Sequence, residues 1–151
     1  MRFLLAFIPF VLLISCKDKN EAEPETFEYV VPDTILAWDI NADSMIMKRD
    51  TAIPDSAITI SRIINGLNDK YPDVHIVVVK QSADTLYTTV PDAGYLGDQM
   101  GDAGAAAWFD DAVINLTSVP GINYVSFDID LHSHAGSGVI SRNKYRGWKR
   151  Q

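Results

Sequence analysis

The sequence predicts a small α+β domain with a mixed or antiparallel sheet and two helices on one face of that sheet. Apolar residues recur at helical spacing in two separate stretches, and shorter stretches rich in β-branched residues flank them. At 151 residues the chain has room for one ordinary domain. The expected order is therefore hairpin, helix, hairpin, helix and strand.

A β-hairpin is expected to open the folded part near Asp33. Residues 35–40 and 44–48 are apolar or β-prone, and Asn41-Ala42-Asp43 between them tolerates the backbone of a turn. The two stretches are therefore expected to pair as neighbouring strands.

The first helix follows this hairpin. Pro54 and Asp55 predict its start. Pro72 predicts its end, because the residue before a proline is disfavoured in helical conformation. Gly66 lies inside this helix and lowers its intrinsic stability by about 1 kcal/mol relative to alanine. The expected buried stripe consists of Ile60, Ile63, Ile64, Leu67 and Tyr71.

A second hairpin is predicted from His75 to Val90. The run from His75 to Lys80 is β-branched, which is typical of a central strand buried on both faces, and residues 85–90 form its partner. Residues 91–104 contain four glycines and three aspartates, and they are expected to form a connecting loop in which Asp102 caps the following helix.

The second helix and the last strand are expected to pack against each other. Pro120 cannot continue a helix and Gly121 can adopt positive φ, so the chain reverses there. The helix face before this turn contains Phe109, Ala112, Val113 and Leu116. The strand after it alternates, with Val125, Phe127, Ile129 and Leu131 on one side and Ser126, Asp128 and Asp130 on the other.

Residues 1–15 have the features of a secretory leader. Arg2 precedes an apolar run from Phe3 to Ile14, which is too short to span a bilayer comfortably. The sequence Leu13-Ile14-Ser15-Cys16 resembles the bacterial lipobox, in which cleavage before the cysteine leaves a lipidated residue. We therefore expect Cys16 to carry the lipid anchor, palmitate included. The alternative is an ordinary leader that contains a cysteine by chance.

Residues 16–30 are expected to hold the domain away from the membrane. From Lys17 to Glu28 the chain is polar and acidic, so it is expected to be a flexible tether, which spans at most roughly 40 Å. The charged residues after Cys16 resemble the export signal of surface lipoproteins in Bacteroidetes-type bacteria. The expected location is the outer membrane of the cell envelope, on either the periplasmic side or the cell surface.

The charge balance disfavours nucleic acid as a partner. The net charge is −7, and without the leader, whose one charged residue is Arg2, 12 basic residues face 20 acidic ones, giving −8. Such a body does not neutralise phosphates well. Cys16 is the single cysteine, so no internal disulfide can form.

Residues 31–140 resemble the GerMN domain, a sporulation and germination module. The similar segments are Asp84-Thr85-Leu86-Tyr87, Pro91-Asp92, Tyr95-Leu96, Gln99-Met100-Gly101, Ala112-Val113, Asn115-Leu116-Thr117, Pro120-Gly121-Ile122 and Val125-Ser126-Phe127. The resemblance implies a fold similar to ring-building modules, with an αββαβ core after the first hairpin. It implies a non-enzymatic module of envelope lipoproteins with protein partners, and no catalytic residue or cofactor. The single copy and the lipobox favour an envelope role over sporulation.

One cluster of metal-ligating residue types stands at the end of the last strand. Asp128, Asp130, His132 and His134 would share one face if the strand continued, and carboxylates with imidazoles are plausible zinc ligands for a metal-dependent hydrolase. Neighbours two apart on a strand are about 6.6 Å from each other, which is too far for four ligands to reach one ion without a bend. A solvated polar face is therefore the preferred interpretation.

The last eleven residues, 141–151, contain five basic residues and no acid. This tail could bind anionic lipid headgroups or an acidic partner, but a solvated terminus lying on the acidic domain is the preferred interpretation. Trp38, Trp108 and Trp148 raise the alternative of a surface glycan-binding lipoprotein, although Trp38 and Trp108 lie in apolar patterns typical of a core.

Overall fold

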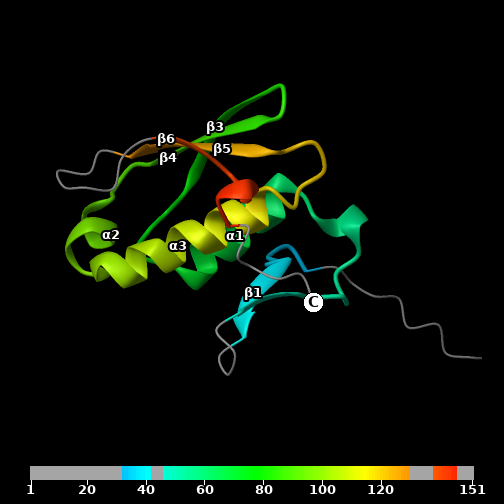
Figure 1. Ribbon diagram of the computed structural model, residues 1–151, viewed down its shortest axis with the longest axis horizontal. Coiled ribbons are helices and arrows are strands. Elements are labelled where there is room, and N and C mark those ends of the chain that lie inside the picture. Colours follow the sequence, from blue (N-terminus) through cyan, green and yellow to red (C-terminus); the bar gives the residue numbers. More distant parts are fainter. Residues whose placement is uncertain (1–31, 42–45, 130–137, 146–151) are drawn as a thin grey trace, which may run out of the picture.

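The computed structural model describes residues 32–41, 46–129 and 138–145 of the chain (Figure 1). These residues form an α+β domain with a four-stranded sheet, two long helices beneath one face of that sheet, and a separate two-stranded hairpin on the far side of the helices (Figure 1). The predicted fold class is confirmed. None of the helices within the described ranges combines the length and the apolarity needed to cross a bilayer.

The first hairpin forms as expected, with shorter strands. Strand β1 (Trp38–Asn41) pairs antiparallel with β2 (Ile46–Arg49). Ile35 and Ala37, which precede β1, are buried in the core, and the Ala37 carbonyl accepts a hydrogen bond from the Asp50 amide over 3.0 Å. The Ile35 amide donates to the Arg62 carbonyl over 3.2 Å, so the chain before the hairpin is attached to the first helix.

The first long helix, α1 (Ile60–Lys70), begins five residues later than predicted. Pro54 and Asp55 instead start a 3-10 turn, η1 (Asp55–Ala57). Thr59 is the cap of α1, because its Oγ1 accepts a hydrogen bond from the Arg62 amide. The predicted helix end is confirmed, since Lys70 is the last helical residue and Pro72 follows shortly after it.

The larger sheet has the strand order β3-β4-β5-β6. Strands β3 (Val77–Ser82) and β4 (Thr85–Val90) form the predicted antiparallel hairpin. Strand β5 (Tyr124–Ile129) pairs parallel to β4, and β6 (Gly138–Ser141) pairs antiparallel to β5.

The prediction that β3 is a central strand buried on both faces was wrong. Strand β4 has β3 on one side and β5 on the other, so β3 lies at an edge of the sheet. All six residues of β3 are exposed. The buried apolar positions of this segment are Val74 and Ile76, just before the strand begins.

The prediction that residues 91–104 form a loop was also wrong. They contain the short helix α2 (Gly94–Asp98) and the first turn of α3 (Gly101–Leu116). The segment after Gly104 is alanine-rich, and alanine has the highest helix propensity. Asp102 lies in the first helical turn rather than at the cap, where it still interacts favourably with the positive helix terminus.

Helix α3 is the centre of the core and lies between the large sheet and β1 (Figure 1). The turn at Pro120 and Gly121 is confirmed, and Gly121 has a φ of +85°. The predicted helix face is confirmed at Ala112, Val113 and Leu116, which are buried, while Phe109 is half-buried against Phe127 with ring centroids 5.3 Å apart. The predicted alternation is confirmed at Val125, Phe127 and Ile129, whereas Asp130 and Leu131 lie outside the described residues.

Candidate functional site

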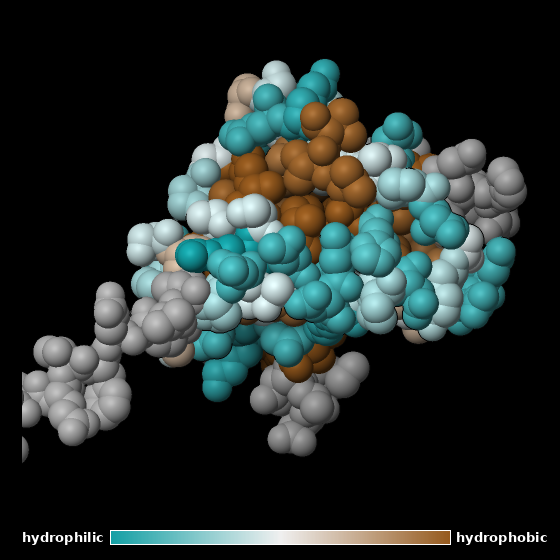
Figure 2. Space-filling view, turned by 180° about the vertical axis from the view of Figure 1, so that it is seen from behind, coloured by the Kyte–Doolittle hydropathy of each residue, from teal (hydrophilic) through white to brown (hydrophobic). Residues whose placement is uncertain are grey.

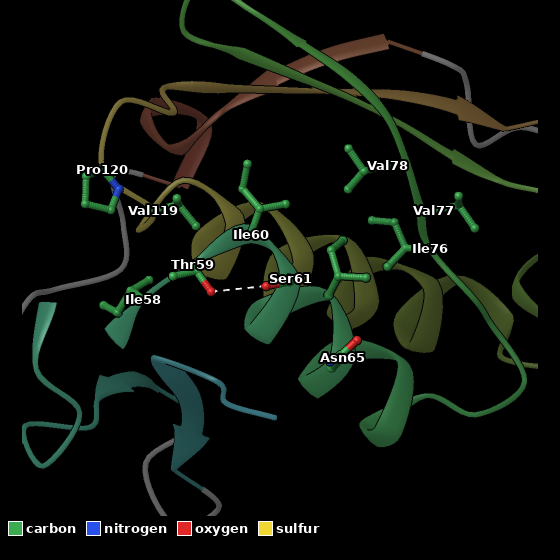
Figure 3. A pocket seen from close by; sticks show the side chains of 11 residues that line it. Ile58, Thr59, Ile60, Ser61, Asn65, Ile76, Val77, Val78, Val119 and Pro120 are labelled. Carbon is green, nitrogen blue, oxygen red and sulfur yellow. Dashed lines mark hydrogen bonds between the residues drawn. The ribbon is translucent and has the colours of Figure 1, made fainter. Parts of the chain in front are cut away.

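An open apolar groove lies between α1 and the edge strand β3. Hydrophobic side chains gather on the face of the molecule turned away from the view of Figure 1 (Figure 2). The groove has a volume of about 860 Å³. Its apolar lining includes Ile64 and the residues labelled in Figure 3 as Ile58, Ile60, Ile76, Val77, Val78, Val119 and Pro120.

Three elements position this lining. The first two turns of α1 present Ile60 and Ile64, which are four residues apart and so share one helical face. Ile60 of α1 and Val78 of β3 lie on opposite sides of the opening (Figure 3). Val119 comes from the turn after α3, where its amide donates to the Leu116 carbonyl over 3.2 Å.

The polar part of the lining is small and uncharged. Thr59 and Ser61 lie at the start of α1, and their hydroxyl oxygens are 3.3 Å apart (Figure 3). Asn65 lies one turn further along and donates through Nδ2 to the Asp33 carbonyl over 3.3 Å. Because none of the described residues that line the groove is acidic or basic, it suits an uncharged ligand.

The β3 side of the groove is exposed and apolar. Val77, Val78 and Val79 are 45%, 36% and 61% exposed. Val78 is paired in register with Thr88, whose side chain is buried, so Val78 is on the helix-facing side of the sheet. The register shifts between Val78 and Lys80, a β-bulge that leaves Val79 without a partner in β4.

The groove was not predicted from the sequence. The valine run was interpreted as a buried strand because a continuous apolar run is typical of one. Lys80 directly after it is the signal that could have indicated an edge, since natural edge strands often contain a lysine. Its Nζ lies 4.8 Å from the centroid of the Tyr87 ring, on the sheet face away from the helices.

A second cluster of chemically active groups lies at the C-terminal end of α1, around the buried Asp111, with Lys70 and Asp39 exposed and Tyr71 half-buried. Lys70 Nζ lies 2.7 Å from Asp111 Oδ2 and 2.7 Å from Asp39 Oδ1, and the Tyr71 hydroxyl donates to Asp111. Burial lowers the pKa of Lys70, but the hydrogen bonds to Asp111 and Asp39 outweigh it and raise the pKa above the usual 10.5. Burial and then the hydrogen bond to Asp111 raise the pKa of Tyr71.

This cluster has a structural role, because it connects three elements of the fold. With raised pKa values, Lys70 and Tyr71 both hold their protons at neutral pH, so neither is an available base or nucleophile. The fully buried Asp111 joins α3 to α1, and Lys70 extends the connection to Asp39 in β1.

The structure describes only one of the four residues considered as an alternative metal site. Asp128 is exposed near the end of β5, opposite Thr89. Asp130, His132 and His134 lie outside the described residues, as does Cys16. Within the described ranges, no group of three or more His, Cys, Asp or Glu side chains is arranged to hold a metal ion.

The aromatic residues proposed for glycan binding are mostly not available at the surface. Trp108 is fully buried, with its ring centroid 5.6 Å from that of Phe127, which confirms the interpretation as a core residue. Trp38 is half-buried against the core, and the Arg142 guanidinium lies 5.6 Å from its ring centroid. Trp148 lies outside the described residues.

The start of the predicted basic tail is packed against the domain. Strand β6 ends at Ser141 and a 3-10 turn, η2 (Arg142–Tyr145), follows, so the predicted boundary at residue 140 divides a strand. Arg142 donates to the Ile114 carbonyl, to Thr117 Oγ1 over 3.0 Å and to Ser118 Oγ. Its charge lies at the C-terminal end of α3, which a cation stabilises.

The resemblance to the GerMN domain rests on the sequence segments that suggested it. Comparison with family models, with curated proteins and with solved structures gives no match. The fold and the groove are therefore the structural observations from which a function is inferred.

Proposed function

We propose that the protein is a lipid-anchored lipoprotein of the cell envelope whose folded domain is a non-enzymatic, GerMN-like interaction module. The single observation that carries the interaction role is the open, uncharged apolar groove beside the exposed edge strand β3. Contiguous exposed apolar surface of this kind marks binding sites on soluble domains.

The envelope location is supported by the sequence before the domain. An apolar leader ends in Leu13-Ile14-Ser15-Cys16, and a polar, acidic stretch separates that cysteine from the first described residue, Pro32. A lipidated Cys16 would hold the domain at a membrane while leaving the groove open to a neighbouring protein. Multiple acyl chains make such anchoring durable, since each buried CH₂ contributes about 0.8 kcal/mol.

The non-enzymatic character is supported by the chemistry of the described residues. Lys70 and Tyr71 both bond to Asp111 Oδ2, and both keep their protons at neutral pH. The groove itself presents aliphatic side chains, two hydroxyls and an amide. This set of groups suits the recognition of an apolar partner.

The anchoring half of the proposal is tested by labelling cells with radioactive palmitate. The full-length chain should incorporate label and fractionate with membranes, whereas Cys16→Ala should do neither. Lys17→Ala is the matched control, since it changes the next residue without removing the thiol. An unlabelled native chain, or equal label in Cys16→Ala, would refute the anchor.

A further inference from the structure

We infer that the groove and the β3 edge bind a short extended segment of a partner protein, which adds as a fifth strand and carries uncharged β-branched side chains with basic flanking residues. The inference rests on the proposed interaction function and specifies its ligand. The backbone of β3 is available for pairing, because within the described ranges no strand pairs with its outer edge. Such an edge offers a row of free N–H and C=O groups.

The groove supplies places for the side chains of an added strand. In this binding mode main-chain hydrogen bonds give affinity, and pockets for alternate side chains give specificity. Successive side chains of a strand point to opposite faces, so every second side chain of the segment would point toward the helices. There it would meet Ile60, Ile64 and Val78, which line the groove.

The size of the surface favours a short segment over a second copy of the chain. Eleven of the residues that the structure describes line the groove, whereas a stable interface between globular proteins uses about 20–30 residues on each side. Two copies paired through β3 would also bring two bulges at Val79 against each other.

Charged residues near the two ends of β3 indicate which residues the bound segment should carry at its own ends. The described lining is uncharged, the exposed Asp73 precedes β3, and the half-buried Asp84 follows it at the hairpin turn, where it accepts a hydrogen bond from Asn123. Lys80 lies between them on β3, but its amine is over the Tyr87 ring, on the sheet face away from the groove. The chain as a whole has a net charge of −7. A segment with basic residues beyond each end of an uncharged centre is therefore complementary, and a second acidic copy is not.

The test is to pan a phage-displayed library of random 12-residue peptides against the full lipid-anchored chain in nanodiscs. Enriched peptides are expected to alternate Val, Ile or Thr with other residues and to carry Lys or Arg at their ends. Synthetic copies should bind Val78→Asp at least tenfold more weakly than the native chain, because the new carboxylate would lie in the groove.

Val139→Asp is the matched control for this variant. Val139 lies on β6, the opposite edge strand of the same sheet, and is 61% exposed. Peptide affinity for Val139→Asp should stay within twofold of the native chain. A second measurement needs no variant: peptides N-methylated at alternate amides keep their side chains but cannot pair along one edge, and they should bind at least tenfold more weakly.

Three outcomes would overturn the inference. The first is no enrichment over empty nanodiscs. The second is that enriched peptides bind Val78→Asp as tightly as the native chain, or bind equally well after N-methylation. The third is that the β3 amides pointing away from β4 are as protected from hydrogen exchange in the free protein as those paired with β4. The last result would mean that a second copy or the chain itself already covers the edge. If a partner is recovered in cells through another surface, the interaction module stands and this ligand is wrong.

Discussion

Replacing Gly66 by alanine should destabilise the protein, although helix propensity alone predicts the opposite. In an isolated helix the change would add about 1 kcal/mol of stability. In the folded protein, an added Cβ would lie 2.3 Å from the Ile35 carbonyl oxygen and 2.7 Å from its carbon. Because both atoms belong to the backbone, no side-chain rotation can relieve the contact.

The expected loss of stability can be estimated from the backbone movement that the added methyl group requires. Helix α1 and the Ile35 segment would have to separate by about 1 Å, and overpacking of this kind costs about 1–3 kcal/mol. The separation also lengthens the hydrogen bond from the Ile35 amide to the Arg62 carbonyl, now 3.2 Å, and such bonds contribute about 1 kcal/mol. After subtracting the gain in propensity, we expect a net loss of about 1–3 kcal/mol.

Urea unfolding of the native chain and of Gly66→Ala, followed by far-UV circular dichroism, measures this difference. In a thermal scan followed by the same signal, the midpoint of Gly66→Ala should lie about 4–12 °C below that of the native chain. Gly94→Ala is the matched control, since that glycine also lies in a helix and its added Cβ would meet only Asp92 Oδ1, at 3.4 Å. If Gly66→Ala were as stable as Gly94→Ala, the close packing of Ile35 on α1 would be refuted.

Three further substitutions test the internal ties of the fold. Asn115→Ala should lose about 2–3 kcal/mol in urea unfolding, because the side chain makes hydrogen bonds of 2.9 and 3.0 Å to both backbone groups of Trp38. Arg142→Ala should lose about 1–2 kcal/mol in the same assay, because it removes the cation at the end of α3. Lys70 and Tyr71 have raised pKa values, so the stability that they contribute is complete below about pH 10 and is lost as the pH rises further. The free energy of unfolding of Tyr71→Phe should therefore fall less steeply between about pH 10 and 12 than that of the native chain.

Exposed neighbours provide the controls for these substitutions. Lys144→Ala removes a cation two residues after Arg142 from an exposed position and should change stability by less than about 0.5 kcal/mol. Asp69→Ala removes an exposed anion from α1 and should change stability by a similarly small amount. A loss in Asn115→Ala or Arg142→Ala no larger than in these controls would contradict the assigned hydrogen bonds, and an unchanged alkaline profile in Tyr71→Phe would contradict its bond to Asp111.

The elements that the sequence predicts well are those fixed by local patterns. The alternation in β5, the reversal at Pro120 and Gly121, and the end of α1 before Pro72 depend on side-chain periodicity or on backbone constraints of one or two residues. All three are confirmed. The start of α1 was misplaced because Pro54 is as compatible with a 3-10 turn as with a helix, and Thr59 is the better cap.

The candidate site could not be predicted, because it depends on the order of strands in the sheet. A run of valines is apolar whether β3 is central or at an edge, and its exposure is decided by where β5 pairs. Gly66 is a similar case. From the sequence it only lowers the helix propensity of α1, whereas in the structure it leaves room for the Ile35 backbone to pack against the helix. The packing of Arg142 likewise depends on the distant end of α3.

The most direct test of the proposed interaction module is site-specific photo-cross-linking in living cells. The full-length chain is made with benzoylphenylalanine at position 78, in the groove, or at position 139, on the opposite edge of the sheet. We expect one discrete adduct with another envelope protein from position 78, absent from position 139 and from Cys16→Ala. Equal adducts from both positions, or none from position 78, would contradict an anchored module that binds through the β3 groove.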